Sequence, residues 1–123
     1  MSLEVKYGFL VEAQEIFEEM LQVKMERLRR LELRKAIKHL VNAMEPFVEE
    51  RNALVQEYGE NGEITPESAR WDEFRVEYED LLNQVTELEV LELSPALLDT
   101  VPMSTRQENI LVVCGFAPEA VEA

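Results

Sequence analysis

The sequence predicts an α+β fold dominated by helices, and three observations lead to this prediction. Apolar residues recur every three or four positions over most of the 123-residue chain, as in amphipathic helices. Residues 3–7 and 88–93 instead alternate apolar with charged side chains, as in half-buried strands. Turn and cap residues separate these segments. We expect one domain, residues 1–123, with an antiparallel helical hairpin, an additional N-terminal helix, a short two-stranded ribbon and a short C-terminal helix.

The first predicted helix covers about residues 9–25. Its apolar stripe faces away from a row of glutamates and consists of Leu10, Ala13, Ile16, Phe17, Met20 and Leu21. Residues 25–33 contain neither Gly nor Pro. The pattern therefore leaves open whether this helix continues or whether the chain turns near Arg29 and Arg30.

A stronger helical pattern follows over residues 33–58. Pro46 lies inside it and removes one backbone donor, which predicts a bend. Because the apolar stripe keeps its phase across Pro46, we expect one bent helix rather than two. Gly59 suits the left-handed position after the last turn, and Asn61-Gly62 predicts a tight turn.

The partner helix of the hairpin is predicted to begin with Thr65 as N-cap and Pro66 in the first helical position. Its apolar face carries Trp71, Phe74, Tyr78, Leu81, Leu82 and Val85. A connection of about seven residues favours antiparallel packing of the two long helices. The aromatic residues are expected to line the seam. Alternatively, Trp71 lies partly exposed near the hairpin tip and anchors a partner.

The C-terminal third is predicted to hold three short elements. Residues 88–93 form a strand that pairs with the N-terminal one, and helices must cover this ribbon because two strands alone are marginally stable. Ser94-Pro95 begins a helical turn that ends near Asp99. Ser104 and Gln107 form a capping box for a helix from Thr105 to about Cys114, which Gly115 ends. Residues 118–123 are expected to be a frayed tail.

Charge is unevenly distributed along the chain. The net charge is −14, from 26 acidic and 12 basic residues. The stretch Lys24–His39 carries +5, which leaves −19 for the remainder. Its basic residues are the candidate partner-binding residues, together with Trp71: Lys24, Arg27, Arg29, Arg30, Arg34, Lys35 and Lys38. This cluster either pairs with the chain's own glutamates or docks on an acidic surface, including that of a second copy. Direct nucleic-acid binding is not expected, because the acidic remainder repels phosphate.

No residue pattern indicates catalysis. Cys114 lies in an apolar run, which favours a buried structural thiol. His39, the only histidine, lies in a different predicted helix, so a Cys–His pair and a zinc site are both disfavoured. Paired acids lie on polar helix faces, where their pKa values are expected to be ordinary. We therefore expect no catalytic, cofactor-binding or metal-binding residue and no cofactor.

Localisation follows from two further observations. No apolar run approaches the roughly 20 residues that span a bilayer, so no membrane association is expected. The N-terminal residues lack the pattern of a signal peptide, so a cytoplasmic protein is expected.

The order of these elements, with "Glu-Val-Leu-Glu-Leu-Ser-Pro-Ala-Leu-Leu-Asp" at residues 89–99 and "Val-Pro-Met-Ser" at residues 101–104, resembles small helical-hairpin proteins of tailed bacteriophages, many of unknown function. A weaker similarity is to prefoldin-type chaperones, whose helices flank β-hairpins. The phage resemblance implies a phage or prophage origin and transfers no functional residue.

The sequence therefore predicts a non-enzymatic protein–protein interaction module, either a host-directed inhibitor or a virion assembly factor. Its partner would be a phage structural protein, a host target or a second copy. The alternative is an acidic nucleic-acid mimic that blocks a DNA- or RNA-binding host enzyme or defence protein.

Overall fold

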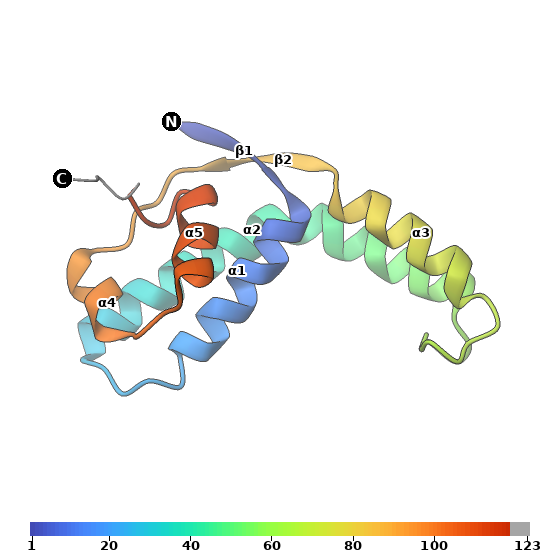
Figure 1. Ribbon diagram of the computed structural model, residues 1–123, viewed down its shortest axis with the longest axis horizontal. Helices are drawn as coiled ribbons and strands as arrows, with labels where there is room; N and C mark the ends of the chain where they lie inside the picture. The colour runs from blue at the N-terminus through green and yellow to red at the C-terminus, as the bar shows by residue number, and fades with distance from the viewer. Residues whose placement is uncertain (119–123) are drawn as a thin grey trace.

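The computed structural model describes residues 1–118 and confirms the predicted fold class, a predominantly helical α+β arrangement (Figure 1). The expected frayed tail, residues 118–123, lies outside the described residues except for Pro118. The elements are, in chain order, β1 (Ser2–Lys6), α1 (Tyr7–Met20), α2 (Arg27–Tyr58), α3 (Trp71–Leu82), β2 (Val85–Glu89), α4 (Pro95–Thr100) and α5 (Thr105–Val113).

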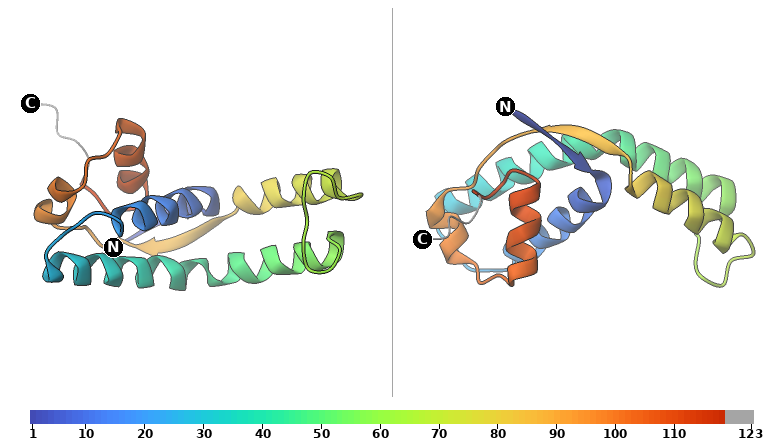
Figure 2. Two further views of the ribbon diagram at one scale, coloured as in Figure 1. Left: turned by 90° about the horizontal axis from the view of Figure 1, so that it is seen from below. Right: turned by 45° about the horizontal axis from the view of Figure 1, so that its top comes forward.

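The long helix α2 organises the molecule, and the other helices lie on one side of it (Figure 2). Helices α1 and α3 follow one another along α2, and both run antiparallel to it. Where they meet, β1 pairs with β2, and the Tyr7 amide donates a hydrogen bond to the Gln84 carbonyl oxygen at 3.0 Å. We call residues 45–82 the arm; they comprise the C-terminal half of α2, α3 and their connection. The body is the remainder of the described chain.

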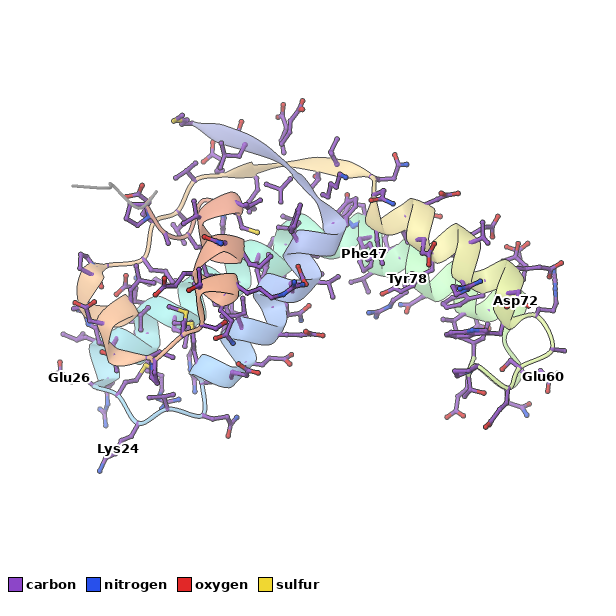
Figure 3. All side chains as sticks on the ribbon, in the orientation of Figure 1. Lys24, Glu26, Phe47, Glu60, Asp72 and Tyr78 are labelled. Carbon is purple, nitrogen blue, oxygen red and sulfur yellow. The ribbon has the colours of Figure 1, made fainter. Side chains whose placement is uncertain are left out.

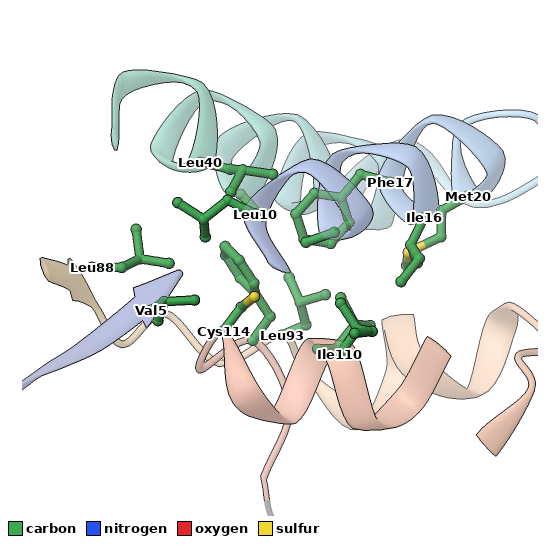
Figure 4. Close-up of a cluster of buried hydrophobic side chains, with 14 of the residues drawn as sticks. Val5, Leu10, Ile16, Phe17, Met20, Leu40, Leu88, Leu93, Ile110 and Cys114 are labelled. Carbon is green, nitrogen blue, oxygen red and sulfur yellow. The ribbon is translucent and has the colours of Figure 1, made fainter. Parts of the chain in front are cut away.

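The hydrophobic core lies in the body, between α1, α2, the sheet and α5 (Figure 4). The predicted stripe of α1 faces this core, and Leu10 and Phe17 are completely buried in it. The Phe17 ring contacts that of Phe116 edge-on, with centroids 4.9 Å apart. The largest fully buried side chains are Phe17, Phe47, Phe116, Leu10, Met20, Leu33, Leu40, Leu88, Leu97 and Leu111.

A row of aromatic rings connects this core with the arm. Phe47 of α2 stacks on Tyr7 at 5.3 Å between centroids and lies 6.1 Å from Tyr78 of α3 (Figure 3). The row continues through Phe74, 5.4 Å from Tyr78, to Trp71, 5.6 Å from Phe74. Each such pair contributes roughly 0.5–1.5 kcal/mol beyond its area burial. The prediction that aromatic residues line the hairpin seam is therefore confirmed.

The structure resolves the ambiguity before α2 and corrects the end of the first helix. The chain turns at residues 21–26, not at Arg29 and Arg30, so α1 ends at Met20 rather than near residue 25. Leu21, Val23 and Met25 still pack against the core, but they do so from a loop. Their apolar character therefore extended the helical pattern in the sequence beyond the helix itself.

The predicted start of the hairpin's second helix is wrong. Helix α3 begins at Trp71, and residues 66–70 form turns and a bend instead. The Thr65 hydroxyl accepts a weak hydrogen bond from the Glu67 amide at 3.3 Å, and the Thr65 carbonyl accepts one from the Ser68 amide at 2.8 Å. These local hydrogen bonds compete with a helix start, which is a known tendency of threonine.

The predicted left-handed cap at Gly59 is also wrong, because this residue is extended with φ −87°. A glycine is needed there for a different reason. A Cβ would lie 2.6 Å from the Val55 carbonyl oxygen and closer still to that of Glu63. The Asn61-Gly62 turn is confirmed, with φ values of 55° and 78°.

The strands lie earlier in the sequence than predicted. The expected strand at 3–7 is β1, Ser2–Lys6, since Tyr7 begins α1, and the expected strand at 88–93 is β2, Val85–Glu89. The two strands pair antiparallel, as expected, with Leu3 opposite Leu88. The prediction that Val85 belongs to the preceding helix is wrong, because its spacing continues the apolar stripe of that helix although the residue begins β2.

The C-terminal elements form as their caps predict. The Ser94 hydroxyl accepts a hydrogen bond from the Leu97 amide at 3.2 Å and caps α4. Ser104 and Gln107 form the predicted capping box of α5. Gly115 follows α5 with φ 79°, the left-handed conformation that favours glycine.

Candidate protein-binding surface

The basic cluster of the sequence does not form one surface. Six of its seven residues lie in the N-terminal part of α2, and Lys24 lies in the loop before it. Arg29 is turned toward the body. Its guanidinium donates to the Ser94 hydroxyl at 2.9 Å and pairs with Glu32 at 3.1 Å. Arg29 therefore has a structural role.

Arg30 also has a structural role. Its guanidinium donates to the Leu21 carbonyl at 3.1 Å and to the Val23 carbonyl at 3.2 Å. These carbonyls follow the C-terminal end of α1, where helices leave acceptors without intrahelical donors. Arg30 thus ties the turn at residues 21–26 to α2.

The remaining basic residues of α2 point away from the body, together with several apolar ones. Leu28, Leu31 and Val41 are 66, 48 and 44% exposed. The helical spacing places this set opposite the buried stripe that contains Leu33 and Leu40. No element within residues 1–118 covers it (Figure 2). We call this set the outer face of α2; it consists of Arg27, Leu28, Leu31, Arg34, Lys35, Lys38, Val41, Asn42, Glu45 and Glu49, all of them exposed.

Charge changes sign along the outer face. Its N-terminal part carries Arg27, Arg34, Lys35 and Lys38, and its C-terminal part carries Glu45 and Glu49. Sequence reasoning found the basic part but missed the acidic continuation. The spacing in the sequence could have shown this. Arg34 and Lys38 are four residues apart, as are Glu45 and Glu49, and helical periodicity places all four side chains on one face.

The arm is the acidic end of the molecule. Residues 45–82 contain twelve acidic and three basic side chains, for a net charge of −9. Arg70 pairs with Glu73 and lies over the Tyr58 ring, 4.3 Å from its centroid. Hydrogen bonding to Glu77 raises the pKa of Tyr58 to about 12; desolvation and the charge of Glu57 add to this, whereas Arg70 opposes it.

Trp71 is not part of the same surface as the basic residues. It begins α3 at the far end of the arm, next to Asp72, whereas Lys24 and Glu26 lie at the opposite end of the molecule (Figure 3). Its side chain is half-buried and contacts Phe74. The candidate partner-binding residues therefore do not form one site. Four of them lie on the outer face, Arg29 and Arg30 make internal contacts, Lys24 lies in a loop and Trp71 lies in the arm.

Cys114 and His39 are engaged within the body. Cys114 is completely buried, and its thiol donates to the Phe9 carbonyl at 3.7 Å. Burial raises the pKa of this thiol to about 12, with the charge of Glu12 adding to the effect. His39 Nε2 donates to the Glu89 carbonyl at 2.7 Å and so connects α2 with β2. Among the described residues, no group of three or more His, Cys, Asp or Glu side chains is placed to hold a metal ion.

A hollow of about 410 Å³ lies where α1 meets the end of α3. Its lining is largely apolar and includes Phe9, Tyr78 and Leu82. Lys6 and Glu12 are its charged side chains, and Glu12 is already paired with Arg106. The hollow therefore lacks the convergent polar groups that define most ligand sites.

Comparisons with protein-family models, with curated proteins and with solved structures gave no match to this chain. None of the helices within residues 1–118 is both long and apolar enough to cross a membrane.

Proposed function

We propose that this protein is a non-enzymatic protein–protein interaction module of bacteriophage origin that acts in the cytoplasm of the bacterial host. Its docking surface is the outer face of α2. One observation supports this most directly: Leu28, Leu31 and Val41 are exposed on a helix face that also carries four basic side chains. The fold uses Arg29 and Arg30 for internal contacts but makes no comparable use of this face.

The composition of the face indicates the chemistry of its partner. Exposed leucines one helical turn apart resemble the anchors of a helix that binds in an apolar groove. Arg27, Arg34, Lys35 and Lys38 surround them and favour an acidic rim on the partner. Apolar burial supplies most of the affinity, whereas the charges govern the association rate and partner choice.

Two roles fit such a module. A host-directed inhibitor would cover an acidic docking site on a host protein. A virion assembly factor would bind a phage structural protein. The identity of the captured partner separates these roles.

The test is affinity capture from phage-infected and uninfected host lysates, with captured proteins identified by mass spectrometry. The wild-type chain is compared with the variant Arg27→Glu, Arg34→Glu, Lys35→Glu, Lys38→Glu. The control reverses two exposed charges elsewhere, Lys6→Glu and Arg75→Glu, which lowers the net charge by 4, compared with 8 in the fourfold variant. We expect a specific protein that the wild type and the control capture and the fourfold variant does not. Equal capture by all three chains would refute docking through this face.

The acidic arm supports a second candidate, a nucleic-acid mimic. Its charge of −9 would suit the basic surface of a DNA- or RNA-binding protein. In that case Glu50→Gln, Glu79→Gln and Asp80→Asn, none of them on the outer face, should weaken capture, and added duplex DNA should compete. If capture withstands both changes, the mimic is excluded.

A further inference from the structure

Four of the six charged side chains of the outer face are arranged symmetrically about one point of α2; the other two, Arg27 and Lys35, map onto Gln56 and Val48. Arg34 and Lys38 lie on one side of the midpoint between Val41 and Asn42, and Glu45 and Glu49 lie at equal distances on the other. All four charged side chains are exposed. Reversing the helix about this midpoint places every acid where a base was.

We infer that the outer face binds a second copy of this chain, with the two α2 helices antiparallel and a two-fold axis passing between Val41 and Asn42. In this register Arg34 faces Glu49 of the partner, and Lys38 faces Glu45. Each pair occurs twice, as in any isologous interface. This inference rests on the proposed function, because it uses the same docking surface and names a second copy of the chain as a partner for it.

The middle of the face fits this arrangement as well. Val41 is 44% exposed beside the axis and would be covered by the second copy. Pro46 has no N–H, so the Asn42 carbonyl lacks its usual helical donor on the exposed side of α2. The two-fold axis therefore passes near a backbone acceptor that α2 leaves without its usual donor.

The expected dimer is weak and depends on salt. Exposed ion pairs are individually modest and are screened by salt, and the apolar contribution is confined to a few side chains. Another protein with an acidic surface would satisfy only the basic half of the face. A second copy pairs Glu45 and Glu49 as well as two of the four bases, which an acidic surface cannot do.

Two charge variants test the pairing by analytical ultracentrifugation at low salt. Arg34→Glu with Lys38→Glu makes the four positions all acidic, and Glu45→Lys with Glu49→Lys makes them all basic. Each variant alone places like charges opposite each other, so each should be monomeric at concentrations where the wild type dimerises. Their equimolar mixture restores all pairs with opposite charge and should dimerise. Because all four positions are exposed, circular dichroism should show unchanged folding.

Three outcomes would overturn the inference: a wild-type chain that stays monomeric into the high micromolar range, variants that dimerise as well as the wild type, or a mixture that stays monomeric. Loss of the dimer in 0.5–1 M salt is expected in addition, since the Debye length falls to about 3 Å at 1 M.

The register is tested by oxidative cross-linking. Val41→Cys places two thiols close to the axis, so a disulfide-linked dimer should form. Gln56→Cys is the matched control, because the two thiols would be 29 residues apart along the seam, roughly 43 Å at 1.5 Å per residue. Native Cys114 is buried and should not contribute. A parallel pair of helices would cross-link at both positions and would refute the two-fold register.

The two proposals fail in different experiments. If the chain is monomeric but the fourfold variant loses a captured protein, the self-pairing is wrong and the proposed function stands. If the dimer forms as described but no capture depends on the outer face, the proposed interaction with another protein is wrong and the self-pairing stands.

Discussion

Glu32 binds both polar hydrogens of Ser94: its Oε2 atom accepts a hydrogen bond from the Ser94 amide at 2.6 Å, and its Oε1 atom accepts one from the Ser94 hydroxyl at 2.7 Å. The two residues lie 62 positions apart in the sequence. Since Ser94 also caps α4, this contact fixes the start of α4 against the N-terminal part of α2. Arg29 completes the cluster through its bonds to both residues.

Removal of this carboxylate should destabilise the fold. Glu32→Ala leaves the Ser94 amide and hydroxyl without their acceptor and Arg29 without its ion-pair partner, so we expect a loss of about 1–3 kcal/mol in the free energy of unfolding, as for hydrogen bonds to charged groups. Urea denaturation followed by circular dichroism measures it. Glu18→Ala, an exposed acid of α1, serves as the control and should change stability by less than about 0.5 kcal/mol. Equal losses in both variants would show that the Ser94 contact contributes nothing of its own.

Arg30 and Arg34 should differ sharply although they are four residues apart on one helix. Arg30→Ala removes two charge-assisted hydrogen bonds to the carbonyls of Leu21 and Val23, with an expected loss of about 1–3 kcal/mol. Arg34→Ala changes an exposed side chain and should cost less than about 0.5 kcal/mol. Conversely, partner binding and dimerisation should be weakened by the change at Arg34. Thermal unfolding and sedimentation of both variants separate these effects, and similar stability of the two would contradict the structural role of Arg30.

Gly59→Ala should destabilise the arm. The new Cβ would clash with the backbone carbonyls of Val55 and Glu63. The Val55 carbonyl accepts the last hydrogen bond of α2, and the Glu63 carbonyl accepts one from the Glu60 amide in the following turn, so moving either breaks a hydrogen bond. We expect a loss of about 1–3 kcal/mol, typical of overpacking. Gly8→Ala is the counterpart within α1, where the nearest atom lies at 3.4 Å, so that change should be neutral or stabilising by up to about 1 kcal/mol. Hydrogen exchange should place the loss near residues 55–63, and unaltered exchange there would argue against the clash.

Cys114 should be unreactive in the folded protein. Burial raises its pKa from the ordinary value of 9.0 to about 12, so the thiolate is scarce at neutral pH. Because the folded pKa is the higher one, the neutral thiol stabilises the fold fully below pH 9, and this contribution is lost as the pH rises from about 9 to about 12. A thiol-reactive chromophore should label the chain slowly at pH 8 and rapidly in urea. Rapid labelling without denaturant would show that the thiol is accessible.

The sequence by itself determined those features that depend on neighbouring residues. The capping box of Ser104 and Gln107, the cap at Ser94 and the Asn61-Gly62 turn formed as expected, because a cap or a tight turn is decided within about four residues. Apolar periodicity likewise located the helices and the aromatic seam, since it records which side of a helix must be buried. The predicted end of the first helix was wrong because loop residues such as Leu21 also pack against the core.

Only the tertiary structure decided which basic residues remain free on the surface. Arg29 reaches Ser94, 65 positions away, and Arg30 binds the turn that follows α1, whereas Arg34 and Lys38 on the same helix are exposed. These residues are chemically alike in the sequence. Their roles differ because folding places acceptors beside one side of α2 and leaves the other side uncovered, and that difference depends on contacts between segments far apart in the chain.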